Sequence, residues 1–127
     1  MNYRKLDVWE KSVQLAVEVC EMADRLPWRA RNLADQVRRS SCSVPSNVAE
    51  STGRSTARDQ RQFAVRARGS LAELDTQLEI CKRLGYVRPT NATEFENRIE
   101  GVGRVLSGLL RYYARRERET TKKRRDG

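Results

Sequence analysis

Apolar residues recur along this chain at the three- and four-residue steps that place them on one side of an α-helix. The clearest run alternates steps of four and three, the spacing of a helix-bundle seam: Phe63, Ala67, Ser70, Leu74, Gln77, Cys81 and Leu84. A second set widens the seam on one side: Ala64, Leu71 and Leu78. Thr56 and Asp59 fit a capping box before the run, and Gly85 fits the position after its end. We therefore predict a helix between Thr56 and Gly85.

A second alternating run follows Pro89 and predicts another helix: Phe95, Ile99, Val102, Leu106, Leu109 and Tyr113. From about Arg115 the apolar pattern fades into charge. Residues 111–127 hold eight basic and three acidic side chains, a net charge of +5. We expect residues 117–127 to form a basic, disordered tail, because the segment offers no apolar face to bury.

Two more helices are predicted before Gly53. The first runs from about Asp7 to Leu26 and carries two adjacent apolar stripes: Trp9, Val13, Ala16, Cys20 and Ala23, then Val8, Leu15, Val19, Met22 and Leu26. A surface helix needs an apolar stripe only about 100° wide, so this helix is either deeply central or meets another subunit. The second runs from near Ala30 to Glu50 and contains Pro45, which should kink it.

Four helices joined by short connections, near residues 27–29, 51–55 and 85–90, imply antiparallel neighbours. The chain has 127 residues, the length of one domain. We predict an all-α fold, an antiparallel up-down four-helix bundle over residues 1–116. No apolar run approaches the length of about 20 residues that spans a membrane.

The cysteines and the N-terminal residues indicate a cytoplasmic protein. Cys20, Cys42 and Cys81 are far apart and form no CxxC pair, so we expect free thiols in a reducing compartment and no zinc site. The charged residues Lys5 and Asp7 occupy the region where a signal peptide would need an apolar run.

The residue inventory argues against catalysis. The chain has no histidine, which removes the Ser/His and Cys/His arrangements and the di-iron bundle. Carboxylates such as Glu50 and Glu73 could hold magnesium. The alternative that we favour is that both carboxylates belong to a buried or half-buried polar network. Its members would be Ser46, Asn47, Glu50, Glu73 and Gln77. Arg38 or Arg68 would supply the counter-charge. We therefore expect no enzymatic activity, no metal and no cofactor.

The net charge of +9 and the pI of about 10.1 favour an anionic partner. Residues 25–68 hold ten arginines against three acidic residues, a net charge of +7, and residues 111–127 add +5, so the other segments are net negative by three. We predict that these side chains contact the phosphates of RNA or DNA: Arg29, Arg31, Arg38, Arg39, Arg54, Arg58, Arg61, Arg68, Arg115, Arg116, Lys122, Lys123, Arg124 and Arg125. Two alternatives stay open: the charge merely solvates the protein, or the protein is an adaptor for an acidic protein partner with no nucleic-acid role.

Four segments resemble a known family. The segments Val44–Glu50, followed by Gly53-Arg54, and Arg68–Leu78 look like its two signatures, Tyr3–Lys11 like its opening, and Gln36–Ser40 like the approach to the kink. The family is that of bacterial proteins encoded in intervening sequences of large-subunit ribosomal RNA genes. Cys20 departs from the pattern, which usually has an aromatic residue there.

The resemblance implies a four-helix bundle that assembles into a homopentameric ring, with no established enzymatic activity. The fold is also similar to that of the accessory proteins of diversity-generating retroelements, which are basic bundles that associate with nucleic acid and reverse transcriptase. From the resemblance and the charge together, we expect a homo-oligomeric, nucleic-acid-binding scaffold.

Overall fold

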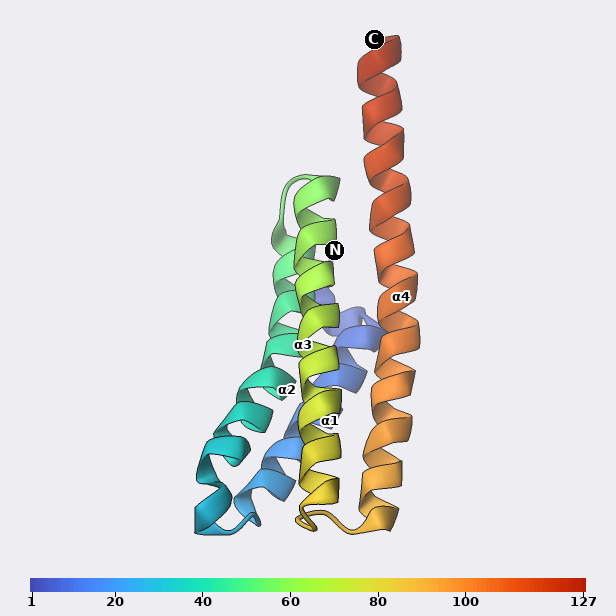
Figure 1. The fold of residues 1–127 in the computed structure, drawn as a ribbon. Helices are drawn as coiled ribbons and strands as arrows, with labels where there is room; N and C mark the ends of the chain where they lie inside the picture. Colours follow the sequence, from blue (N-terminus) through green and yellow to red (C-terminus); the bar gives the residue numbers. More distant parts are fainter.

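The computed structural model describes residues 1–127 and contains helices only (Figure 1). The four long helices are α1 (Asp7–Asp24), α2 (Arg31–Gly53), α3 (Ala57–Arg83) and α4 (Pro89–Asp126). Single-turn 3₁₀ helices precede the first two: η1 (Tyr3–Lys5) and η2 (Trp28–Ala30). Consecutive helices run antiparallel and contact each other in chain order, and α1 also contacts α4. The predicted all-α, up-down four-helix bundle is therefore confirmed. None of the helices combines the length and the apolar character that crossing a membrane requires.

The helix boundaries follow from local sequence signals. The Thr56 Oγ1 accepts a hydrogen bond from the Asp59 backbone N–H at 3.1 Å, which caps the start of α3. Gly85 ends the turn after α3 with a φ of 79°, a left-handed conformation that glycine adopts without a Cβ penalty. Pro45 lies inside α2, as predicted, and α2 changes direction along its length (Figure 1). A proline inside a helix removes one backbone hydrogen bond, which accounts for a bend.

The core is one apolar cluster to which all four helices contribute. On α3 the buried strip is rotated relative to the predicted seam. Its members are Gln60, Ala64, Ala67, Leu71, Leu74, Leu78 and Cys81, which again alternate steps of four and three. Ser70 and Gln77 are only half-buried, and Leu84 is 58% exposed. Because α3 packs between α2 and α4, its core strip is centred between two seams and includes the residues that the sequence placed on one flank.

A buried hydrogen bond joins the end of α2 to α4. The hydroxyls of Ser51 and Tyr113, both 0% exposed, lie 3.1 Å apart. The Ser51 hydroxyl donates its single proton to the Val48 carbonyl at 2.6 Å. Tyr113 is therefore the donor to the Ser51 Oγ. Burial is the main cause that raises the pKa of Tyr113, so the phenol stays neutral.

The structure corrects one prediction about the C-terminus. Residues 117–127 were expected to be disordered, but α4 continues as a helix to Asp126. Arginine, lysine and glutamate are good helix formers, and no proline or glycine interrupts this stretch before Gly127. In the extension, which we define as residues 118–126, every side chain is exposed. Its side-chain hydrogen bonds, from Thr120 and Thr121, stay within α4. Helix propensity, not tertiary packing, accounts for this part of α4.

The Ser51–Tyr113 bond gives an asymmetric prediction for stability. Ser51→Ala should lower the free energy of unfolding by about 1–3 kcal/mol, because it leaves a buried phenol without an acceptor. Tyr113→Phe should cost less, about 0.5–1.5 kcal/mol, since Ser51 keeps its bond to the Val48 carbonyl. Urea denaturation of the two single variants and the double variant measures this order. Equal costs would contradict the assigned donor and acceptor, and a double variant that loses the sum of both would show that the two hydroxyls do not interact.

Candidate nucleic-acid interface

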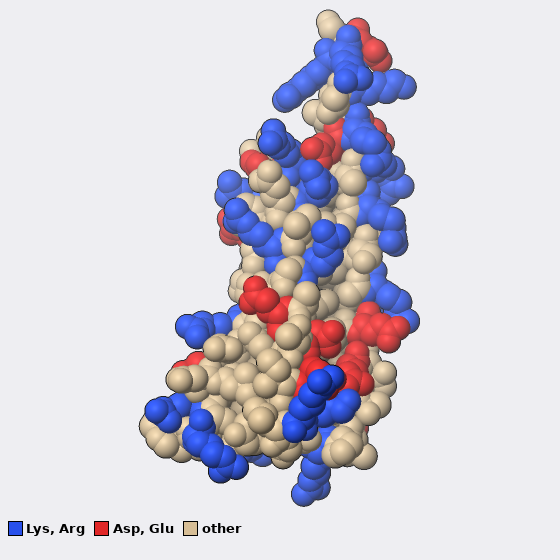
Figure 2. All heavy atoms as spheres, viewed as in Figure 1, with Lys and Arg blue, Asp and Glu red and all other residues tan.

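Lysine and arginine side chains gather at the end of the bundle where α2 finishes, α3 begins and α4 continues beyond both (Figure 2). Two contacts fix this arrangement: Ser51 on α2 meets Tyr113 on α4, and Arg61 on α3 meets Glu117. We call the cationic side chains around these contacts the distal basic surface: Arg54, Arg58, Arg61, Arg115, Arg116, Arg118, Lys122, Lys123, Arg124 and Arg125.

A hollow of about 630 Å³ lies within the distal basic surface, between the start of α3 and the extension of α4. Its charged lining residues are Arg61, Arg118, Lys122 and Arg125 against Glu117 and Asp126. The Arg61 Nε donates to the Glu117 Oε2 at 2.6 Å, which ties the two helices together. The remaining cationic groups outnumber the remaining carboxylate, so the hollow suits an anion such as a phosphate group.

Most of the predicted phosphate contacts are free to bind an anion. Of the fourteen predicted side chains, only Arg38, Arg54 and Arg61 have a carboxylate oxygen within 4 Å. Arg38 is the most engaged, at 2.8 Å from Asp24 and 3.0 Å from Asp35. The hydrogen bond to Asp24 is the main cause that raises the pKa of Arg38. This arginine therefore holds α1 against α2 and is poorly placed to contact a ligand.

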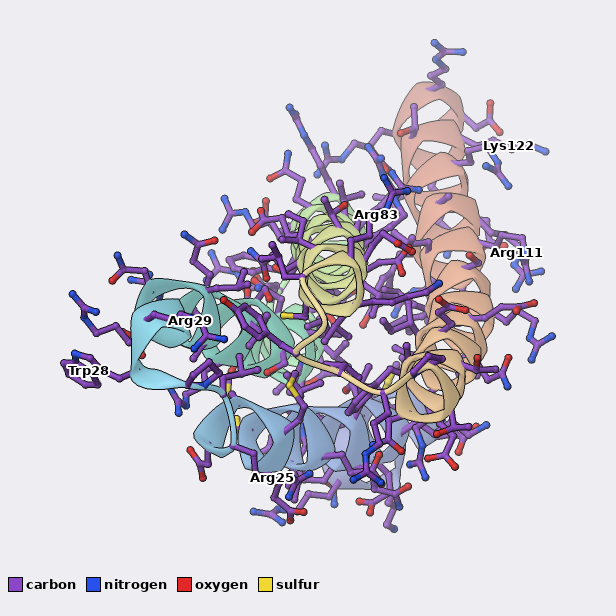
Figure 3. The ribbon with its side chains drawn as sticks, turned by 60° about the horizontal axis from the view of Figure 1, so that its bottom comes forward. Arg25, Trp28, Arg29, Arg83, Arg111 and Lys122 are labelled. Carbon is purple, nitrogen blue, oxygen red and sulfur yellow. The ribbon has the colours of Figure 1, made fainter.

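The structure does not bring the fourteen residues onto one surface. Arg29 and Arg31 lie at the opposite end of the bundle, beside Trp28. Arg31 stacks over the Trp28 ring at 4.7 Å, and Arg29 over the Tyr86 ring at 5.5 Å. Trp28 is 79% exposed and points away from the bundle (Figure 3). The length of α2, about 35 Å at 1.5 Å per residue, separates this end from the distal basic surface.

Arg39 and Arg68 belong to neither end. Both are exposed and lie along the middle of α2 and α3. Arg118, which lines the distal hollow, is not among the fourteen residues that the sequence predicted. The position of Arg118 became informative only with the extension of α4 as a helix, because a helix places residues 118, 122 and 125 on one face. Of the fourteen predicted residues, nine fall on the distal basic surface, so the prediction located this surface although it did not delimit it.

The predicted polar network is not formed. Glu50 and Glu73 are exposed, and the Glu50 carboxylate meets only Arg54, at 3.3 Å. Ser46 is exposed and donates to the Cys42 carbonyl within its own helix. The prediction of buried carboxylates was wrong because both residues lie on the solvent side of their helices, where no partner helix covers them.

A different set of polar side chains joins α2 to α3. The Ser40 hydroxyl donates to the Gln77 Oε1 at 2.6 Å, and the Ser43 and Ser70 hydroxyls lie 2.8 Å apart. Asn47 donates to the Ser43 carbonyl at 2.8 Å and to its Oγ at 2.9 Å. The sequence carried a signal for this seam: Ser40, Ser43 and Asn47 follow steps of three and four, and Ser70 and Gln77 are one heptad apart. Of the predicted network, only Asn47 and Gln77 belong to it.

An apolar groove of about 620 Å³ runs along the outer side of α1 and α2. Val17 in this groove is 51% exposed, an unusual position for a valine. The core buries Val8, Leu15, Val19 and Met22 of one stripe of α1, whereas Trp9, Val13 and Cys20 of the other stripe face the groove. Ala16 and Ala23 of that second stripe are buried as well. We call the apolar residues and thiols that line it the α1–α2 groove: Trp9, Val13, Val17, Cys20, Cys42, Pro45 and Ala49.

Metal ligands do not gather anywhere in the structure: no group of three or more cysteine or acidic side chains could hold an ion. The three cysteines are free thiols. Cys81 is 0% exposed in the core, and burial raises the pKa of its thiol. Cys42 is exposed and Cys20 is half-buried.

Comparisons with known proteins found a family model and a solved structure that match this chain. The family model, described as 23S rRNA-intervening sequence protein, matches residues 4–108. The crystal structure of a protein of unknown function from the S23 ribosomal protein family of Bacteroides thetaiotaomicron has a TM-score of 0.74 at 19% sequence identity. The match covers 81% of this chain and 97% of that one. At such an identity the likeness establishes the fold alone. None of the curated proteins compared with this chain matches it.

The matched range holds α1, α2 and α3 and about half of α4, and it contains all the segments that carried the resemblance except for Tyr3, the first residue of one of them. The extension of α4 and all residues of the distal basic surface on that helix lie outside it. Because the family model matches most of the chain, this protein belongs to the 23S rRNA-intervening sequence protein family.

Proposed function

We propose that this protein is a non-enzymatic, self-associating scaffold that binds RNA or DNA through phosphate contacts on the distal basic surface. The observation that carries the proposal is the concentration of cationic groups at one end of the bundle, most of them without a carboxylate partner. Residues 50–61 and 115–126 hold ten arginines and lysines against five acidic residues. Their net charge of +5 is more than half of the total of +9.

Phosphate contact without base recognition fits this surface. Arginine and lysine bind phosphate oxygens irrespective of the base, and each contact releases condensed counterions. Base recognition on single strands relies on exposed aromatic side chains on which bases stack. Among the cationic residues at the distal end of α4, only Arg116 lies over an aromatic ring. Its guanidinium carbon is 5.7 Å from the centroid of the Tyr112 ring. The exposed Trp28 lies at the opposite end of the bundle.

Self-association is the second part of the proposal. In a single copy of the chain, the α1–α2 groove leaves Val17 exposed and Trp9 only half-buried. Exposed apolar surface of this kind is typical of a site of protein contact. We propose that a second copy covers the groove, and the family resemblance implies a ring of five. Several distal basic surfaces in one assembly would raise the avidity for a long polyanion without any new contact.

The proposal includes no catalytic step. Glu50 and Glu73 were the carboxylates with a conceivable metal role, and they lie on separate helices with no shared contact. The chain also has no histidine to act as a general base near neutral pH.

Charge reversal at the distal basic surface tests the nucleic-acid part. Arg58→Glu combined with Lys122→Glu removes two cations that have no carboxylate partner. The slope of log K against log salt concentration should become shallower by about 2, one for each lost phosphate contact. Fluorescence anisotropy with labelled duplex RNA, duplex DNA and single-stranded RNA over a salt series measures it. Arg61 is left unchanged, because reversal there would also break its contact with Glu117.

The matched control is Arg39→Glu combined with Arg68→Glu. It changes the net charge by the same amount, at exposed arginines in the middle of the bundle. This control should bind nearly as the unchanged protein does. Equal losses in both variants would mean that total charge matters and that the distal surface is no site. Absence of binding near physiological salt would overturn the nucleic-acid proposal and favour the adaptor with an acidic protein partner.

Removal of Thr120–Gly127 separates binding from folding. The truncated protein loses four cationic side chains, so the salt slope should fall by about 4. The thermal midpoint of the bundle should stay unchanged, because these residues are exposed and hydrogen-bond only within α4. Circular dichroism gives the midpoint, and anisotropy gives the slope. A lower midpoint would show that the extension contributes to the stability of the bundle.

Val17→Glu tests the self-association. Val17 is already half-exposed in the single chain, so a charge there should leave the fold intact and oppose the burial of the α1–α2 groove by another copy. Sedimentation velocity should show an assembly for the unchanged protein and monomers for the variant. Gln14→Glu adds the same charge at an exposed position of α1 outside the groove and should leave the assembly intact. An unchanged protein that sediments as a monomer would contradict the proposal.

A further inference from the structure

Cys20 and Cys42 face each other across the α1–α2 groove. The antiparallel register of the two helices is fixed by the ion pair of Asp24 with Arg38, at 2.8 Å. One helical turn further along each helix, four residues from each partner, lie Cys20 and Cys42. Both thiols line the same groove, and the Cys42 thiol lies near enough to contribute to raising the pKa of Cys20. They come from different helices and are separated by 21 residues of chain.

The two thiols differ in access. Cys42 is exposed, whereas Cys20 is half-buried against α2. Burial, and next the neighbouring Cys42 thiol, raise the pKa of Cys20. An oxidant from solvent therefore reaches Cys42 first, and Cys20 is held beside it to react second. Cys81 takes no part, because it is 0% exposed in the core of the bundle.

We propose that Cys20 and Cys42 form an oxidative modification site, at which a hydroperoxide converts the two thiols into an intramolecular disulfide between α1 and α2. The Cys42 thiol loses its proton, and the sulfur attacks one peroxide oxygen, which breaks the O–O bond and gives a sulfenic acid. The departing hydroxide takes up the proton that the thiol lost and leaves as the first water. The Cys20 sulfur then attacks the sulfenic sulfur, forms the S–S bond and releases the hydroxyl as a second water. In total, two thiols lose two electrons and two protons, and one hydrogen peroxide is reduced to two waters.

This inference goes beyond the proposed function and is independent of nucleic-acid binding. Its one connection with the proposed self-association is that a second copy bound in the α1–α2 groove would shield Cys42 from an oxidant. The disulfide would join α1 to α2 within the groove and close a loop that includes η2. Constraining such a loop restricts the unfolded chain, so the oxidised protein should have a higher thermal midpoint than the reduced protein.

The experiment treats the reduced, folded protein with hydrogen peroxide and then alkylates the remaining thiols in denaturant. Intact mass spectrometry should show a chain lighter by two hydrogen atoms that takes up one alkyl group in place of three. Peptide mapping should find the Cys20 peptide linked to the Cys42 peptide. The same treatment of Val17→Glu distinguishes a shielded groove from an absent reaction, since that variant is designed to keep the groove open.

Cys20→Ser and Cys42→Ser are the controls, and neither should form the intramolecular disulfide. In Cys20→Ser the oxidised Cys42 lacks its resolving thiol and should trap as a sulfenic acid that dimedone labels. Three alkylated thiols after treatment of both the unchanged protein and Val17→Glu would overturn the proposal. Disulfides that join two chains through Cys42, or that involve Cys81, would overturn it as well.

Discussion

The packing of α2 between α1 and α3 determines where every surface of this protein lies. On one side the ion pair of Arg38 with Asp24 fixes the register with α1. On the other side Ser40 meets Gln77, and Ser43 meets Ser70, which fixes the register with α3. A slip of α2 by one helical turn would break both sets of contacts. The polar groups thus add positional specificity to an apolar core that is itself tolerant of sliding.

The consequences of this register extend to both ends of the bundle. It brings the end of α2 against α4, where Ser51 bonds with Tyr113, and so aligns the start of α3 with Glu117. It also sets the α1–α2 groove, which Pro45 and Ala49 of α2 line together with the exposed Val17 of α1. The basic end and the apolar side are therefore products of the same helix arrangement, although their chemistry is unrelated.

The sequence predicted helix existence well, because apolar periodicity and caps are local signals. Thr56 and Gly85 bounded α3 correctly, since a cap depends on neighbours within a few residues. Rotation about the helix axis was harder to predict. Leu71 and Leu78 belong to the centre of the buried strip, because α3 has neighbours on two sides, and the sequence of one helix does not state how many neighbours it has.

For the candidate site as well, the types of residue could be predicted from the sequence, but their arrangement in space could not. Cationic residues could be identified from composition, but their grouping depended on which helix ends meet, so Arg29 was separated from Arg58 by the length of the bundle. The network with Glu50 and Glu73 failed for a related reason. A carboxylate in a characteristic segment was assumed to be buried, whereas these two face solvent. Membership of a motif gives no information about the direction of a side chain.

The extension of α4 has a consequence for how such a protein can change over evolutionary time. Residues after Glu117 contribute nothing to the core, and they lie outside the range that the family shares. Insertions, deletions and changes of charge in this segment are therefore free of the packing constraints that act on the other helices. Affinity for a polyanion can drift, sharpen or disappear in a lineage while the bundle stays the same. Within this architecture, the fold and the proposed binding of a polyanion can therefore change independently.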